Sequence, residues 1–226
     1  MQPASVVINE AARLLLDKGN DKWPRSHLAH AIAFTLREIV GLRPYALSEL
    51  DTMKLAAGYE QQVPADVVRW LGGVRNMGSD GATPGRTIVD GNWKTLKAFD
   101  PDLYGRRPGS EVREVYWDES TPRVFYTYPP VTSQTDVHIQ FQGAKAPPDG
   151  STIEQDETTV LPISEDYAAT LLDGVMAYAL SEQFGPVNER SPNEAQAYAN
   201  RFYQGLQRDY QVKGRFEPNE NQRRSR

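Results

Sequence analysis

The stretch 112–128, VREVYWDESTPRVFYTY, contains the clearest structural pattern in this chain. Apolar and polar residues alternate from Val112 to Trp117 and again from Arg123 to Tyr128. A period of two is typical of a β-strand that buries one of its faces. The sequence DESTP at 118–122 separates the two runs and has the composition of a turn. The stretch therefore predicts a β-hairpin.

More strands are predicted on both sides of this hairpin. The runs Val67–Val74 and Val137–Phe141 are apolar or alternating. Turn sequences follow them, NMGSDG at 76–81 and PPDG at 147–150. We therefore expect a β-rich region over 51–163.

Helical patterns precede the β-rich region. Apolar residues recur at helical spacing over Ser5–Lys18, and Gly19 is the expected end of this helix. A second helix is predicted over Pro24–Val40, with Gly41 and Pro44 ending it. The apolar stripe of the second helix is predicted to contain Leu28, Ala31, Ile32, Leu36 and Ile39.

Two further helices are predicted after the β-rich region. One begins near Ser164 and ends at Gly185. The other begins at 191–194, SPNE, a capping box with proline in the first helical position, and ends at Gly214. The side chains expected to be buried between the two helix pairs include Leu14, Ile32, Leu36, Leu171, Val175 and Phe202.

The predicted fold class is α+β. The N- and C-terminal helix pairs, 1–50 and 164–214, are expected to form an antiparallel helical bundle, into which the β-rich domain 51–163 is inserted. Residues 215–226 are expected to form an extended C-terminal arm. Because this arm has little apolar content, we expect it to become ordered only on a partner.

The composition excludes several classes of protein. The 226 residues include no cysteine, which excludes disulfides and cysteine nucleophiles. Lys plus Arg number 25 and Asp plus Glu 30, a formal net charge of -5. The only basic run is QRRSR at 222–226, so we do not expect stable wrapping of nucleic acid. We also expect no membrane span and no signal peptide.

Metal and phosphate sites find little support in the sequence. His27 and His30 are three residues apart on a predicted helix, but no carboxylate stands at a ligand spacing beside them. His138 alternates with apolar strand residues and is expected to be exposed. The glycine-containing loop 78–86 lacks the lysine and hydroxyl residues that end a P-loop. We therefore expect no metal, no cofactor and no enzymatic activity.

A carbohydrate-binding or carbohydrate-active β domain remains an alternative. It would use paired carboxylates for catalysis and exposed aromatic rings for stacking. The residues available for it are Asp100, Asp102, Asp118, Glu119, Trp117, Phe125, Tyr126 and Tyr128. For the aromatic residues, packing across neighbouring strands is the commoner arrangement.

A series of short motifs follows a familiar order. They are Trp23-Pro24, Leu42-Arg43-Pro44, QQVPAD at 61–66, VRNMG at 74–78, DG at 80–81, PGR at 84–86, DP at 100–101, PRVFY at 122–126 and YPP at 128–130. In order and spacing they resemble the head-to-tail adaptor (connector) proteins of tailed bacteriophages of the podophage type. The resemblance extends from about Val7 to Tyr210.

The resemblance implies a structural role in the virion neck, after assembly in the host cytoplasm. Such adaptors form a homo-oligomeric ring, usually a dodecamer, beneath the portal protein. The ring joins the DNA-filled head to a tail or nozzle protein, and DNA passes through its channel without specific binding. The helical part of these proteins contacts the portal and neighbouring subunits, and the β-rich part points toward the tail.

The resemblance also implies that a C-terminal arm reaches the portal. In this chain the portal-binding residues would be Phe216, Arg223, Arg224 and Arg226. A tail-tube or neck-completion protein of the virion remains a second alternative.

Overall fold

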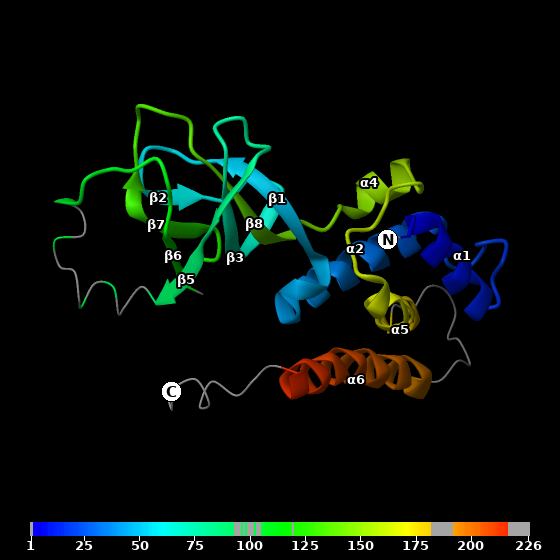
Figure 1. The fold of residues 1–226 in the computed structure, drawn as a ribbon. Helices are drawn as coiled ribbons and strands as arrows, with labels where there is room; N and C mark the ends of the chain where they lie inside the picture. Colours follow the sequence, from blue (N-terminus) through cyan, green and yellow to red (C-terminus); the bar gives the residue numbers. More distant parts are fainter. Residues whose placement is uncertain are drawn as a thin grey trace. The chain divides into compact units, whose positions relative to one another are not determined.

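The computed structural model describes residues 2–92, 96, 98, 102, 105–118, 120–181 and 192–216 (Figure 1). It combines helices with two β-sheets, so the predicted α+β class is confirmed. The chain divides into two compact units. We call Met1–Ala46 with Pro147–Arg226 the helical unit, and Leu47–Ala146 the β unit.

The segment 147–163 belongs by its contacts to the helical unit, although it was predicted as part of the β-rich domain. It includes the short helix α4 (Gly150–Gln155), which the sequence did not predict. Ile153 is the one large apolar side chain that α4 buries, so this helix has no apolar periodicity to detect. We predicted that the parts bounded at 50 and 163 fold independently, and this stays a prediction.

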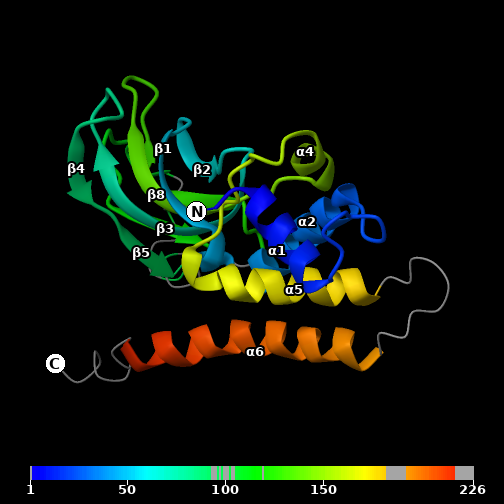
Figure 2. The ribbon, with the colours of Figure 1, turned by 90° about the vertical axis from the view of Figure 1, so that its right-hand side faces the viewer.

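The helical unit is organised around its most apolar helix, α5. The helices are α1 (Ala4–Leu14), α2 (Arg25–Leu42), α4, α5 (Ala168–Ser181) and α6 (Pro192–Phe216), with 3₁₀ turns at Pro44–Leu47 and Glu165–Tyr167. Helix α5 packs against α1, α2 and α6. Both views show α6 alongside α5 (Figure 1 and Figure 2). No residue from Thr170 to Leu180 is classed as exposed, which agrees with a central position.

The predicted buried side chains of the helices are mostly confirmed. All members of the stripe predicted for α2 are buried. Ile32, Leu36, Leu171, Val175 and Phe202 are also buried as expected, whereas Leu14 is half-buried. Leu14 is near the end of α1, and Leu15 is the residue there that is fully covered.

Helix α1 ends earlier than predicted, at Leu14. Leu16, with φ 57°, takes the left-handed conformation that was expected of Gly19. The Asp17 carboxylate explains the early end, because it accepts hydrogen bonds from the backbone N–H groups of residues 21, 22 and 23, at 2.8 Å from Trp23. These bonds fix the loop that leads to α2.

Neither Gly41 nor Gly214 ends its helix, whereas Pro44, predicted with Gly41 to end α2, does follow its last turn. Helix α2 continues through Gly41 to Leu42, and Pro44 then prevents the preceding residue from staying helical. Helix α6 continues through Gly214 to Phe216. A glycine inside a helix costs only about 1 kcal/mol relative to alanine, which good helix formers around it can offset.

The β unit contains two sheets. The strands are β1 (Ser48–Lys54), β2 (Gly58–Gln62), β3 (Val67–Met77), β4 (Pro84–Thr87), β5 (Val89–Asn92), β6 (Glu114–Trp117), β7 (Val124–Val131) and β8 (His138–Lys145). One sheet has the order β1-β8-β3-β4 and the other β2-β7-β6-β5. Strands β6 and β7 pair antiparallel, with Trp117 opposite Phe125, so the predicted hairpin is confirmed.

The core of the β unit lies between the two sheets. The Trp70 ring, from β3, stacks on Phe125 of β7 with ring centroids 3.9 Å apart. The Phe141 ring of β8 also stacks on the Trp70 ring, and the two centroids are 5.2 Å apart. All three side chains are completely buried. The alternating apolar and polar residues that predicted these strands therefore point in turn to this core and to the outer faces of the sheets.

Candidate functional site

The histidines do not form a metal site in the part of the chain that the structure describes, where no group of three His, Asp, Glu or Cys side chains is close enough to hold an ion. The His27 ring packs against Tyr178 with centroids 5.9 Å apart. A carboxylate oxygen of Glu154 lies 3.9 Å from the Nε2 of His30. His138 is half-buried rather than exposed, because Gly81 of the 78–86 loop lies against its ring.

The glycine-containing loop is the turn between β3 and β4. The side chain of Asp80, within this loop, already binds backbone N–H groups of the loop. The Asp80 carboxylate accepts hydrogen bonds from the N–H groups of Ala82 and Thr83, at 2.9 and 3.0 Å. The Thr83 hydroxyl donates a third bond, at 2.7 Å. These bonds lower the pKa of Asp80 to about 2. An incoming phosphate would meet a carboxylate there, so the loop does not suit anions.

Two of the four acidic residues considered for a glycosidase, Asp100 and Glu119, lie outside the described residues. Asp118 accepts hydrogen bonds from the N–H and the hydroxyl of Ser120, at 2.9 and 2.8 Å, and so stabilises the turn between β6 and β7. Phe125, one of the aromatic residues considered for stacking, is buried in the β core.

Several large apolar side chains of the helical unit are exposed, among them four from α2, from the turn that follows α2 and from α6. We call Phe34, Leu42, Tyr45 and Tyr203 the outer strip. Phe34 and Leu42 are two turns apart on one face of α2, and Phe34 is 51% exposed.

Polar and aromatic contacts hold the outer strip in place. Glu38 lies on α2 between Phe34 and Leu42, and its carboxylate accepts a 2.5 Å hydrogen bond from the Tyr203 hydroxyl of α6. The Phe34 ring lies 5.0 Å from that of Tyr178 on α5, measured between centroids. Three helices thus fix the side chains of this surface before any partner arrives.

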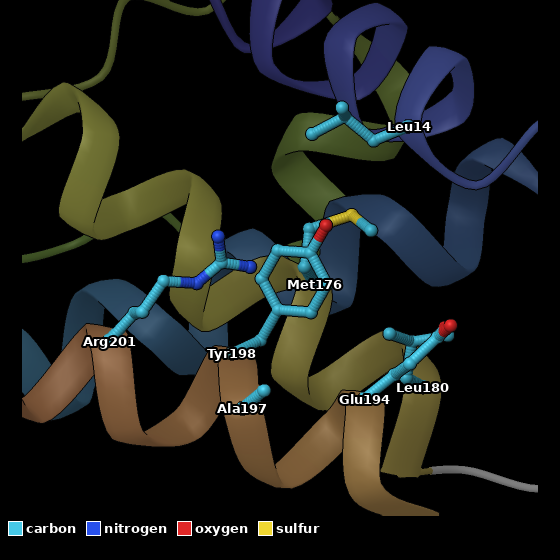
Figure 3. Close-up of a pocket in the computed structure, with 7 residues that line it drawn as sticks. All are labelled: Leu14, Met176, Leu180, Glu194, Ala197, Tyr198 and Arg201. Atoms are coloured by element: carbon cyan, nitrogen blue, oxygen red, sulfur yellow. The ribbon is translucent and has the colours of Figure 1, made fainter. Parts of the chain in front are cut away.

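A hollow of about 300 Å³ opens between α1, α5 and α6 (Figure 3). The residues that line it are Leu14, Met176, Leu180, Glu194, Ala197, Tyr198 and Arg201. The side chains from α1 and α5 are apolar, and the charged side chains Glu194 and Arg201 come from α6.

The Arg201 side chain is held at the hollow by two neighbours. The centre of its guanidinium group lies 4.1 Å from the centroid of the Tyr198 ring, within the range of a cation–π contact. Its Nε lies 3.5 Å from an Asp173 carboxylate oxygen of α5. Burial raises the pKa of Asp173, and the charge of Arg201 opposes that increase. This pair therefore connects α5 and α6 beside the hollow.

The predicted portal-binding arm falls almost wholly outside the described residues. Arg223, Arg224 and Arg226 lie there, and Phe216 is described only in its backbone, as the last residue of α6. The sequence pattern did not indicate the outer strip, because periodicity predicts buried faces and is silent on which remaining apolar residues stay exposed.

The sequence model of one family, described as SU10 adaptor protein, matches residues 3–225. The chain therefore belongs to this family of phage adaptor proteins, and its resemblance to a phage head-to-tail adaptor is confirmed. The match spans both units and includes the C-terminal segment. No match was found among curated proteins.

The family is a structural one and is not normally enzymatic. A role in the virion fits this membership. In the described residues, no helix combines the length and the apolar character that a bilayer span requires.

Proposed function

We propose that this chain is a head-to-tail adaptor that forms a ring beneath the portal of a tailed phage. The resemblance to phage adaptors implies that this ring is a dodecamer. The ring joins the DNA-filled head to a tail or nozzle protein, and DNA passes through its channel. The observation that carries the proposal is the family match over 3–225, which spans both units. The net charge of -5 supports a channel that does not bind DNA tightly.

The proposal assigns different contacts to the two units. The helical unit contacts the portal and the neighbouring subunits. Its two helix pairs form an antiparallel bundle. The β unit faces the tail. The outer strip supports the first assignment, because a subunit of a closed ring needs apolar surface that its own core does not use.

The direct test is to mix the purified protein with portal and measure the mass of the complex. Light scattering should give a portal complex enlarged by one adaptor ring, and negative-stain images should show added density at one end of the portal. If the protein stays monomeric beside unaltered portal under all ionic conditions, the proposal is wrong.

The outer strip is tested by Phe34→Glu. A charge placed at the centre of an apolar contact should prevent ring formation on the portal, because burying it unpaired is costly. Gln204→Glu adds the same charge at an exposed polar position of α6 and is the matched control. Equal loss of assembly in both variants would mean that charge, and not the strip, decides the contact.

The C-terminal arm is tested by removing 217–226, which keeps all of α6 as the structure defines it. Deletion should leave thermal stability nearly unchanged and weaken portal binding, since arginines pair well with carboxylates. Replacing Arg223, Arg224 and Arg226 by glutamine should reproduce most of the loss. Replacing Asn219, Asn221 and Gln222 by serine is the control that should retain binding. Full binding after deletion would remove the arm from the proposal.

A further inference from the structure

Strand β1 is an edge strand, because it stands first in the sheet order β1-β8-β3-β4 and pairs with β8 on one side. Just beyond it, the Leu55 N–H donates a 2.8 Å hydrogen bond to the Val137 carbonyl, in the same register as the pairs of β1 with β8. Along an antiparallel pair, residues bonded to the partner strand alternate with residues whose backbone groups point away from it. In β1 the residues whose backbone N–H and C=O groups point away from β8 are therefore Ser48, Leu50, Thr52 and Lys54.

Two of these outward donors are open to an incoming chain. Outside the strand pairing, no hydrogen bond among the described residues involves the backbone N–H of Leu50 or Lys54. Both residues are exposed, and the exposed fraction of Leu50 is 61%. The Thr52 N–H between them donates a 2.7 Å hydrogen bond to the Asp51 Oδ1. The edge is therefore accessible from solvent, and a carboxylate covers one of its donors.

The other edge strands of the two sheets have features that hinder pairing with a further chain. Short length, proline and irregular pairing are the usual means by which an edge strand is protected. Strand β4 has four residues and begins with Pro84, and β5 also has four residues. The pairing of β2 shifts between Gly58 and Glu60. Strand β1 has seven residues without proline, glycine or a shift, so it is the edge most suited to accept a strand.

The charges on one face of β1 are mostly acidic. Glu49 and Asp51 point to the face opposite to that of Leu50, because successive side chains of a strand alternate. Asp66 is close to Asp51, since the Lys145 ammonium group contacts both carboxylates, at 2.7 Å and 2.9 Å. The hydrogen bond from Lys145 lowers the pKa of Asp66. One ammonium group thus serves two of the carboxylates on this face, and a strand beside β1 gains from a basic residue there.

We propose that β1 binds an extended segment of a partner protein, which adds a fifth strand to the sheet and carries a basic residue beside Asp51. Outward donors and acceptors recur along β1 at every second residue, roughly 7 Å apart, and an extended polypeptide matches them. A nucleic-acid backbone offers acceptors and no such row of donors. The basic residue gives the Asp51 carboxylate a new partner, so the Thr52 N–H becomes available to the segment.

A second copy of β1 fits this edge less well. If two β1 strands pair antiparallel over their full length, Asp51 lies opposite Asp51, and a shift of two residues in one direction places Glu49 opposite Asp51. Like charges directly opposite each other destabilise a sheet. A shift in the other direction leaves only 50–54 to pair.

The inference deepens the proposed function, on which it rests for the presence of a different protein at the β unit. It adds the chemistry by which that unit recognises its partner. Since the proposed ring and portal contacts involve the helical unit, the two proposals can fail separately.

The test uses the full chain and, as the probe, a peptide of sequence KVKTKVK blocked at both ends. Saturation with this peptide should slow hydrogen exchange of the Leu50 and Lys54 amides at least about tenfold, because both become bonded. The Met53 amide already bonds to β8 and should be unaffected. The peptide EVETEVE has the same alternation with acidic residues and should bind at least about fivefold more weakly, because of Glu49 and Asp51.

Proline variants test the edge directly. Leu50→Pro removes one outward N–H and keeps the bonds to β8, as proline does on an edge strand. It should weaken binding of KVKTKVK about tenfold. Gln62→Pro is the matched control on β2, where the Val63 N–H bonds to the Arg123 carbonyl and the groups of Gln62 point outward. It should retain peptide binding.

Dispersed amide spectra verify that both variants fold, and if Leu50→Pro unfolds, the exchange rates of the unaltered chain decide. Loss of the peptide in Leu50→Pro together with a normal portal complex would support the site and leave the ring proposal intact. Unchanged exchange of the Leu50 and Lys54 amides at saturation, or equal losses in both variants, would overturn the site. Self-association of the chain that Leu50→Pro removes would overturn the different partner. Equal binding of EVETEVE would overturn the basic residue.

Discussion

At the scale of single residues, acidic side chains in this protein organise turns. Asp17, Asp80 and Asp118 each accept bonds from backbone N–H groups a few residues ahead. Aspartate favours such turns because its short side chain reaches its own backbone. The sequence therefore predicted the turns at 76–81 and 118–122. The sequence did not show that the Asp80 side chain binds the backbone of its own loop, because that contact depends on how the chain folds back.

The pH dependence of the Asp80 turn follows from its pKa of about 2, below the ordinary aspartate value of 3.8. Because the folded state holds this proton less tightly than the unfolded state, the turn contributes its full stability above about pH 4. That contribution should disappear as the pH falls through about 2. A ¹³C NMR titration of the Asp80 carboxyl measures the pKa directly. Asp80→Asn should show no such pH dependence, and a normal Asp80 titration would contradict the assignment.

The site residues differ in how far the sequence could predict them. The lack of a histidine or carboxylate cluster could be anticipated from spacing. The cross-strand pairing of Arg75 with Gln140 could not be predicted, because it depends on the register between β3 and β8, which are distant in sequence. A shift of one residue in that register would turn Gln140 into the core.

At the scale of elements, helices with strong caps or long apolar stripes were predicted well. Helix α6 begins at Pro192, the residue predicted for its first position. Strands β4 and β5 were missed, because each is short and β4 is fully exposed, so neither has an alternating pattern. Gly41 and Gly214 were misread as helix ends because a glycine marks a stop only when it takes the left-handed conformation.

Two helical glycines provide a matched test of how the helices pack. A methyl group at Gly174 of α5 would overlap Thr35 of α2 and lie 2.9 Å from the Phe202 ring of α6. Gly174→Ala should therefore destabilise the protein by about 1–3 kcal/mol in urea denaturation. Gly41→Ala meets no atom within 4 Å and should stabilise α2 by about 0.5–1 kcal/mol. If both changes prove neutral, α5 does not contact α2 and α6 as closely as described.

At the scale of the whole molecule, the two units have separate cores. Leu171 and Val175 are completely buried in the helical unit, and Trp70 and Phe141 in the β unit. Leu171→Ala should cost about 2–5 kcal/mol, as a large-to-small change in a packed core. Hydrogen exchange should then accelerate in α2, α5 and α6 and stay unchanged in β3 and β8. Equal acceleration in both units would show that they unfold as one.

The two ends of the β unit lie close together. Strands β1 and β8, which begin and end this unit, pair antiparallel, with Ser48 opposite Ala144. Residues opposite each other in an antiparallel pair have Cα atoms about 5 Å apart. The chain thus leaves the β unit next to the place where it enters, as is common for inserted domains. This arrangement agrees with the predicted discontinuous organisation.

We therefore expect 47–146 to fold alone, since it contains both sheets and the complete Trp70 core. Joining Ala46 to Pro147 through a short Gly-Ser linker should likewise give a folded helical unit. Well-dispersed amide spectra and cooperative thermal transitions of both products would verify this. Trp70→Ala should unfold the isolated β unit, and Arg86→Gln should leave it folded. If 47–146 aggregates or lacks a cooperative transition, the β unit depends on the helices for its stability.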